Sequence, residues 1–253
     1  MSTRVAVVTG SNKGIGLATV RALCKEFEGD VYLTARNCGI YQGDALSPLL
    51  FSIRLNPLSE IIDKTDYGYR LRTGAVVSHL LYINDIKLYA KSERDIDSLI
   101  HTTRIYSNGR VVNVSSMNCV SGLKKCSPDL QQRFRNENIT EEELVELMQR
   151  FVDEAKKGEH KERGWTDGAY TVSKIGLTVL SVIHARRLTK ERPNDGILLN
   201  ACCPGWVRTD MAGPTAPKSP DEGAVTPVYL ALLPSGAKEP HGKYLSDKEV
   251  QPW

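Results

Sequence analysis

The chain has no long hydrophobic segment. No apolar run in its 253 residues approaches the ~20 residues that a membrane-spanning helix needs. The first residues, Met-Ser-Thr-Arg, lead directly into a short apolar run and carry no signal-peptide pattern. With 41% hydrophobic and 25% charged residues, the composition is that of a soluble globular protein, and the length suits one α/β domain. We therefore expect a protein that is neither inserted in a membrane nor secreted.

Cysteine and histidine are present but lack the spacings of disulfide frameworks and metal sites. The six cysteines form no Cys-x-x-Cys pair, and the five histidines form no His-Glu-x-x-His motif. In a chain of this size, scattered cysteines are typical of reduced thiols in the cytoplasm. The formal net charge of +3 is too small to indicate a nucleic-acid partner. We therefore expect a cytoplasmic protein that binds neither a metal ion nor nucleic acid.

The N-terminal residues have the order strand, glycine-rich turn, helix. An apolar run at residues 5–8 has the length of a buried parallel strand, and Val20 and Leu23 begin a helical spacing. Between them lies the sequence Thr9-Gly10-Ser11-Asn12-Lys13-Gly14-Ile15-Gly16. Glycines let a backbone approach a pyrophosphate closely, and a helix N-terminus offers free N–H groups. The pattern favours a dinucleotide-binding loop, and the alternative is an ordinary tight turn.

Two basic residues indicate which dinucleotide is bound. Arg36 directly follows a second expected strand, residues 31–35, where an acidic residue would bind a ribose 2′-hydroxyl. An arginine at this position suits a 2′-phosphate, and Lys13 in the turn supplies a second cation. We therefore expect NADPH rather than NADH as the cofactor. The alternative for each residue is a solvated surface charge.

Polar side chains further along form a candidate catalytic set. A β-branched run at residues 110–116 ends in two serines, and Tyr170 and Lys174 have the spacing that brings two side chains to one helix face. A phenol has an ordinary pKa of about 10, which a neighbouring ammonium lowers by favouring phenolate. A serine hydroxyl can hold a carbonyl oxygen in place. The set predicts proton donation to a carbonyl that receives a hydride.

These motifs resemble those of the short-chain dehydrogenase/reductase family. The TGxxxGxG turn, the strand ending in Ser-Ser and the Tyr-x-x-x-Lys pair carry the resemblance, and residues 10–16 with Leu33-Thr-Ala-Arg36 resemble its cytosolic carbonyl reductases. The resemblance covers residues 1–36 and 108–253. It implies a Rossmann-like α/β fold, a doubly wound parallel sheet in a single domain, with Ser116, Tyr170 and Lys174 as catalytic residues. The cofactor-binding residues that it implies are Gly10, Asn12, Lys13, Gly14, Ile15, Gly16, Arg36, Tyr170, Lys174, Pro204, Gly205, Val207 and Thr209.

Two further segments resemble the same family. Residues 198–211 are similar to the strand and Pro-Gly loop that close over the nicotinamide, which implies that Trp206 lines the substrate pocket, with simple packing as the alternative. Cys203 in this segment is expected to be a buried, inert thiol. A capping box at Thr140 and Glu143 predicts a helix with one apolar face. In the carbonyl reductases, such an insertion covers the face that other members use to form tetramers, which implies a monomer.

Residues 38–107 do not continue the family pattern. The Asn-Asn-Ala-Gly motif and the following helix with a catalytic asparagine are absent. Residues 39–51 and Tyr82-Ile83-Asn84-Asp85 instead resemble the GxxQGxxxSPxLF and YxDD motifs of a non-LTR retrotransposon reverse transcriptase. Two-metal phosphoryl transfer needs a cluster of carboxylates, and Asn84 stands where the YxDD motif has its first aspartate. We therefore expect a reverse-transcriptase-like fragment without polymerase activity that interrupts a reductase domain.

The interruption removes a central strand of the expected sheet. Unpaired backbone groups on both sides of such a gap would be costly. We hypothesise that residues 76–83 replace the missing strand as a central parallel strand. The alternative is that they pair with residues 86–90 in a hairpin and leave the sheet incomplete.

The sequence thus predicts a cytoplasmic, monomeric reductase that transfers hydride from NADPH to ketones, aldehydes or quinones. One alternative is an impaired remnant that binds NADPH without turnover. The other is a chimera that binds nucleic acid through its transposon-like segment.

Overall fold

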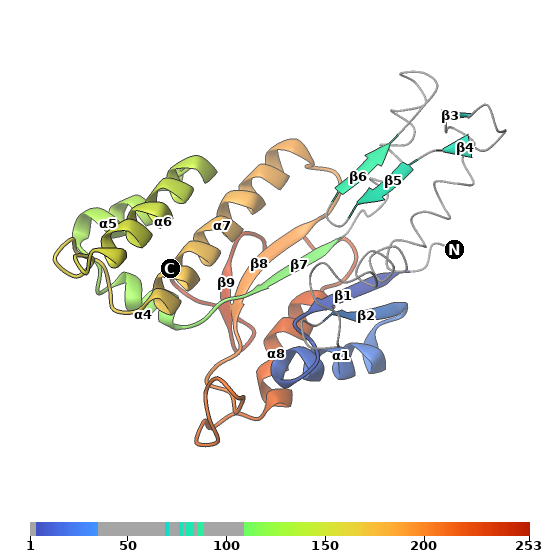
Figure 1. Ribbon diagram of the computed structural model, residues 1–253. Helices are drawn as coiled ribbons and strands as arrows, with labels where there is room; N and C mark the ends of the chain where they lie inside the picture. Colours follow the sequence, from blue (N-terminus) through green and yellow to red (C-terminus); the bar gives the residue numbers. More distant parts are fainter. Residues whose placement is uncertain (1–3, 35–68, 71–75, 78, 83–84, 89–108) are drawn as a thin grey trace. The chain divides into compact units, whose positions relative to one another are not determined.

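The computed structural model describes residues 4–34, 69–70, 76–77, 79–82, 85–88 and 109–253 (Figure 1). The chain forms two compact units. The first comprises Met1–Asn12 and Cys24–Ser107, and the second comprises Lys13–Leu23 and Asn108–Trp253. Arg36 and the reverse-transcriptase-like residues 39–51 and 83–84 lie outside the described residues.

The first unit begins with two parallel strands. β1 (Val5–Thr9) pairs with β2 (Asp30–Thr34), with Val5 opposite Asp30. The turn before β2 passes close to the start of β1, because a Cβ atom on Gly29 would lie 2.1 Å from the carbonyl oxygen of Arg4. A glycine is therefore required at position 29, between the helix α1 (Gly14–Glu26) and β2.

The first unit also contains two hairpins. β3 (Tyr69–Arg70) pairs antiparallel with β4 (Val76–Val77), and β5 (His79–Tyr82) pairs antiparallel with β6 (Asp85–Leu88). Our hypothesis that residues 76–83 form a central parallel strand is wrong. The alternative hairpin is confirmed for residues 79–82, which pair with residues 85–88, whereas residues 76–77 pair with residues 69–70. The physical reason is loop closure: pairing of two segments that are close together in the sequence orders little chain, whereas insertion between two distant strands must order much more.

The second unit contains a four-stranded sheet. β7 (Arg110–Val114), β8 (Leu198–Cys203) and β9 (Tyr244–Ser246) are parallel, and β10 (Glu249–Val250) adds an antiparallel edge. Every residue of β8 is buried. Burial at every position, rather than at alternate positions, is the pattern of a parallel strand that is covered on both faces.

Helices cover both faces of this sheet. On one face lie α4 (Asn118–Leu123), α5 (Pro128–Phe134), α6 (Glu141–Lys156) and α7 (Ala169–Glu191), and on the other lies α8 (Pro220–Ala231) (Figure 1). Cys203 belongs to the core under α4 to α7, whereas the adjacent Cys202 packs against Leu230 of α8. This alternation confirms the Rossmann-like α/β fold with helices on both faces of a parallel sheet.

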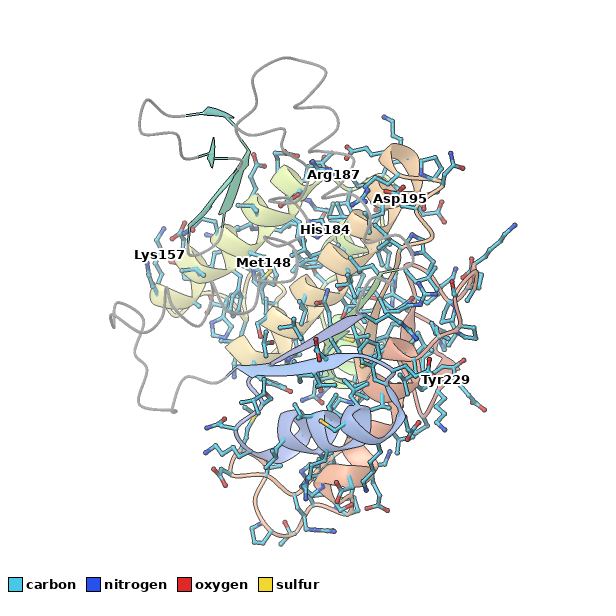
Figure 2. All side chains as sticks on the ribbon, turned by 90° about the vertical axis from the view of Figure 1, so that its right-hand side faces the viewer. Met148, Lys157, His184, Arg187, Asp195 and Tyr229 are labelled. Carbon is cyan, nitrogen blue, oxygen red and sulfur yellow. The ribbon has the colours of Figure 1, made fainter. Side chains whose placement is uncertain are left out.

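The inserted helix α6 packs on α7. The capping box is present: the Thr140 hydroxyl accepts from the Glu143 amide, and the Glu143 carboxylate accepts from the Thr140 amide. Met148 of α6 lies over Gly176 of α7, where a Cβ atom would come within 2.8 Å of its sulfur (Figure 2). Among the described residues, no helix is long and apolar enough to cross a membrane.

Candidate active site

The first turns of α7 hold the two most informative side chains of the site. The helix starts after Gly168, whose φ of +85° suits glycine, and Tyr170 and Lys174 follow one turn apart. The Lys174 Nζ atom lies 5.6 Å from the centre of the Tyr170 ring, which confirms the proximity that their spacing predicts. Tyr170 is 44% exposed, so its phenol is accessible to a substrate.

Lys174 is anchored to the end of β7. Its Nζ atom donates a 2.8 Å hydrogen bond to the Val114 carbonyl oxygen. That carbonyl points away from β8, because the next amide, that of Ser115, bonds to Cys202 of β8. Among the strands that the structure describes, β7 has no partner on this edge. Lys174 thus pairs with the Val114 carbonyl, a group that a neighbouring strand would otherwise pair with. Burial lowers the pKa of the Lys174 ammonium group.

The two serines after β7 have different environments. Ser115 is buried, and its Oγ atom is hydrogen-bonded to the Thr178 hydroxyl at 2.7 Å and to the Lys174 carbonyl at 3.2 Å. Ser116 is half-buried, and its Oγ atom accepts a 3.2 Å hydrogen bond from the Asn118 amide. An accepted hydrogen bond leaves the hydroxyl proton free to donate. The geometry therefore favours Ser116 as the group that faces a substrate, and Ser115 as a link between β7 and α7.

Alanine variants of these serines should separate the two roles. Ser116→Ala is expected to lower kcat about 10²–10³-fold, as loss of one oxyanion donor does, with unchanged stability. Ser115→Ala is expected to destabilise the fold by about 0.5–1.5 kcal/mol, because the buried Ser115 hydroxyl and its hydrogen bonds to Thr178 and to the Lys174 carbonyl are lost, while Thr178 keeps its own bond to that carbonyl. Steady-state kinetics and urea unfolding of both variants measure these effects. A Ser115→Ala enzyme with wild-type stability and a larger kcat loss than Ser116→Ala would reverse the assignment.

The loop after β8 is held by backbone contacts. Gly205 has a φ of +85°, and a Cβ atom there would lie 2.8 Å from the Lys218 side chain. Val207 is buried and forms a β-bridge with Lys218. A Cβ atom on Gly223 of α8 would come within 2.6 Å of the Val207 side chain. Trp206, between these anchored residues, is 55% exposed, which disfavours its alternative role as a packing residue.

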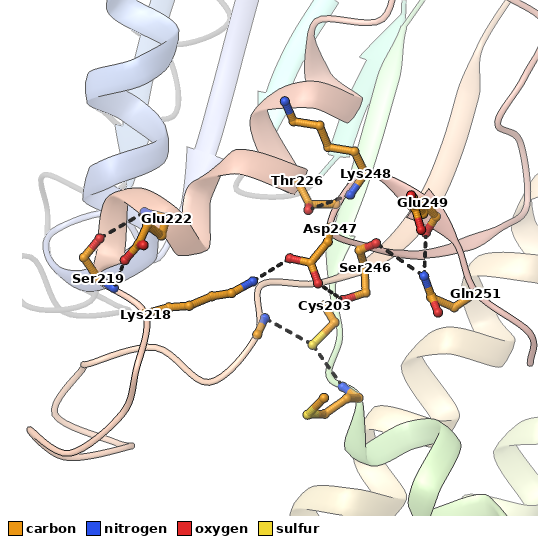
Figure 3. A network of polar contacts seen from close by, with 12 residues as sticks. Cys203, Lys218, Ser219, Glu222, Thr226, Ser246, Asp247, Lys248, Glu249 and Gln251 are labelled. Atoms are coloured by element: carbon orange, nitrogen blue, oxygen red, sulfur yellow. Dashed lines mark hydrogen bonds and ion pairs between the residues drawn. The ribbon is translucent and has the colours of Figure 1, made fainter.

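A buried sulfur connects this loop with the serine loop. The Cys203 Sγ atom accepts hydrogen bonds from the Met117 amide at 3.1 Å and the Gly205 amide at 3.2 Å, as Figure 3 shows. The adjacent Cys202 is fully buried, and burial raises the pKa of its thiol to about 12. The prediction that Cys203 is buried is confirmed, and its sulfur has a structural task.

The glycine turn is divided between the two units. Gly10 and Asn12 belong to the first unit, and Lys13, Gly14, Ile15 and Gly16 belong to the second. Gly10 and Gly14 have φ values of +64° and +57°, a backbone region in which a side chain is strained. In the second unit, a Cβ atom on Gly14 would lie 3.3 Å from the Thr209 methyl group. The part of the turn that belongs to the second unit and the Pro-Gly loop are therefore neighbours.

One contact in this region has no signal in the sequence. Lys13 forms an ion pair and hydrogen bond with Asp210, the residue after Thr209. The two residues are 197 positions apart, so neither local spacing nor periodicity relates them. Asp210 is the charged group at this site that sequence reasoning missed.

Comparison with known proteins identifies the family. Carbonyl reductase [NADPH] 1 of Homo sapiens is 49% identical to this chain over 271 residues, which cover 98% of both chains. The enzyme of the same name from Sus scrofa is 48% identical over 275 residues, and the alignment covers 100% of this chain and 95% of that enzyme. This chain belongs to the carbonyl reductase family of short-chain dehydrogenases/reductases. No protein-family model matches the chain.

Solved structures share the fold of this carbonyl reductase family member. Salutaridine reductase from Papaver somniferum has a TM-score of 0.63 at 22% identity and covers 96% of this chain and 99% of its own. Menthone neomenthol reductase from Mentha piperita has a TM-score of 0.57, also at 22% identity, and covers 97% and 99%. The alignment with the human relative spans 271 residues against the 253 of this chain, so at least 18 residues of that relative have no counterpart here.

Proposed function

We propose that this protein reduces ketones, aldehydes or quinones with NADPH as the hydride donor. The observation that carries the proposal is the placement of Lys174 beside Tyr170 and against the end of β7, next to the serine loop. Membership of the carbonyl reductase family supports the same reaction, because the curated relatives carry NADPH in their names.

Each catalytic side chain has one task in this reaction. NADPH, when bound, supplies the hydride that attacks the carbonyl carbon. The Ser116 hydroxyl donates a hydrogen bond to the carbonyl oxygen, and the Tyr170 hydroxyl transfers its proton to that oxygen as negative charge develops. The Lys174 ammonium stabilises the charge left on the phenol oxygen and binds the cofactor ribose. Trp206 lines the substrate side of the site.

The glycine turn fits a dinucleotide. A Cβ atom on Gly10 would meet no atom within 4 Å, so its missing side chain leaves open space, and Gly14 starts a helix of 13 residues. The residues proposed to hold the adenosine phosphates are Gly10, Asn12, Lys13, Gly14, Ile15, Gly16 and Arg36. Those proposed to hold the nicotinamide ribose and ring are Tyr170, Lys174, Pro204, Gly205, Val207 and Thr209.

Calorimetric titration of the full chain tests the cofactor. NADPH is expected to bind at least tenfold more tightly than NADH, because charge-assisted hydrogen bonds to the 2′-phosphate contribute roughly 1.5–3 kcal/mol each. Lys13→Ala should reduce the preference without changing NADH affinity. Equal affinities of the wild-type chain for the two cofactors would contradict the assignment of Lys13 and Arg36 to the phosphate.

A second candidate function is cofactor binding without turnover. The observation that favours it is that β1 pairs with β2 and β7 pairs with β8, with no strand joining these pairs among the described residues. A quinone-reduction assay on protein that binds NADPH decides between the two: binding without NADPH oxidation identifies an impaired reductase.

We further propose a cytoplasmic monomer with small-molecule substrates and no nucleic acid, whose segment 38–107 is of reverse-transcriptase origin. The five described cysteines form no disulfide, which supports the cytoplasmic location. Helix α6 covers α7, because Met148 of α6 lies over Gly176 of α7 and the His184 Nε2 atom of α7 lies 3.4 Å from Glu141 of α6. This cover supports the monomer. Sedimentation tests the monomer, and a gel shift that weakens with salt would reveal nucleic-acid binding.

A further inference from the structure

The ion pair between Lys13 and Asp210 joins the glycine turn to the loop after β8. Both side chains are largely exposed, at 62% and 77%. The Lys13 ammonium holds the pKa of the Asp210 carboxyl below its ordinary value, so this carboxylate is charged throughout the neutral range. A negative charge therefore stands beside a lysine that the proposed function assigns to a phosphate.

The backbone on both sides holds the two partners in place. The Lys13 carbonyl accepts a hydrogen bond from the Leu17 amide, at the start of α1. Asp210 lies in a turn in which the Thr209 carbonyl accepts from the amides of Ala212 and Gly213, and Thr209 itself lies against Gly14. The meeting of the two charges is therefore a consequence of how the two loops are built.

We infer that Asp210 is a specificity-determining residue that weakens NADPH binding by competing with the 2′-phosphate for Lys13. The inference rests on the proposed function. A phosphate monoester carries about −1.5 to −2 charges at pH 7. The 2′-phosphate can reach Lys13 in two ways. It lies beside the Asp210 carboxylate, which repels it, or it displaces the carboxylate, which breaks the ion pair. Both outcomes oppose binding. NADH has a neutral hydroxyl at this position, so Asp210 affects it little. Asp210 thus reduces the preference for NADPH that Lys13 and Arg36 create.

The experiment is calorimetric titration of NADPH and NADH into the full chain and its Asp210→Asn variant. NADPH affinity is expected to rise about two- to fivefold, the range that exposed ion pairs produce, and NADH affinity to stay constant. The gain should shrink toward onefold in 1 M salt, where the screening length is about 3 Å. In a Lys13→Ala background, the gain from Asp210→Asn should be smaller, because there is no longer a lysine for the carboxylate and the phosphate to compete for.

The matched control is Asp221→Asn. Asp221 is 72% exposed and forms an ion pair with Arg21 at 3.7 Å in the same unit, so its variant removes the same charge from a comparable environment. It should leave both affinities unchanged.

Three results would overturn the inference. Unchanged NADPH affinity in Asp210→Asn would show that no competition exists. An equal loss of affinity for both cofactors would show that the ion pair ties the two loops over the cofactor. An equal gain of NADPH affinity in Asp221→Asn would show that the effect comes from the net charge of the protein and not from the position of Asp210. By contrast, absence of NADPH binding by wild type and Asp210→Asn alike would overturn the proposed function together with the inference.

Discussion

Tyr170→Phe is expected to lower quinone and ketone reduction about 10²–10⁴-fold, the range that general acid catalysis contributes, while NADPH affinity stays within about twofold of wild type. The change removes one hydroxyl from a side chain that is 44% exposed, so the fold loses little. The ring remains beside the Lys174 ammonium, which the proposed function assigns to the cofactor ribose.

NADPH oxidation measured with a quinone, together with calorimetric titration, checks this result. Tyr229→Phe is the matched control, because Tyr229 is a half-buried tyrosine of α8 that packs against the core around Leu230 (Figure 2). It should retain wild-type activity. Turnover that survives in Tyr170→Phe would place the proton donor elsewhere or identify the measured activity as a contaminant.

Lys174→Met is expected to lower kcat/KM about 10²-fold or more and to weaken NADPH binding, because the proposed function assigns one ammonium to both the phenol and the ribose. The same variant should have a different pH dependence of stability. Burial lowers the pKa of Lys174 below its ordinary value of 10.5, which means that the unfolded chain binds its proton more tightly than the folded chain.

The sign of the pH effect follows from that shift. At a pH below the pKa values of both the folded and the unfolded chain, Lys174 is charged in both states. The full cost of burying this charge then lowers the free energy of unfolding. As the pH rises from the lowered pKa toward 10.5, the folded chain releases the proton first, and the penalty disappears. The free energy of unfolding of wild type should therefore rise relative to that of Lys174→Met across this window.

Urea unfolding of both proteins from pH 7 to 10 measures the difference. Lys190→Met, a change at an exposed lysine in the last turn of the same helix, is the control and should give a curve parallel to that of wild type. Parallel curves for wild type and Lys174→Met would contradict the lowered pKa. Unchanged NADPH affinity in Lys174→Met would contradict the ribose contact.

Several features could be predicted from the sequence because neighbouring residues determine them. The capping box at Thr140 and Glu143 closes over three positions, and the spacing of Tyr170 and Lys174 brings them together on any helix. The positive φ values at Gly10 and Gly14 accompany a glycine-rich turn. The strand within residues 198–211 was predicted from its resemblance to the family's strand and Pro-Gly loop, and the structure places β8 there.

Tertiary structure decided the features that depend on distant residues. The hairpin of β5 and β6 formed where a replacement central strand was expected, because local pairing orders less chain. Ser115 and Ser116 differ because only Ser115 reaches the buried Thr178 hydroxyl. The contact of Lys174 with the Val114 carbonyl and that of Lys13 with Asp210 join residues 60 and 197 positions apart. Patterns of period 2 or 3.6 describe single elements, whereas these contacts depend on how separate elements pack, and no pattern within one element encodes that packing.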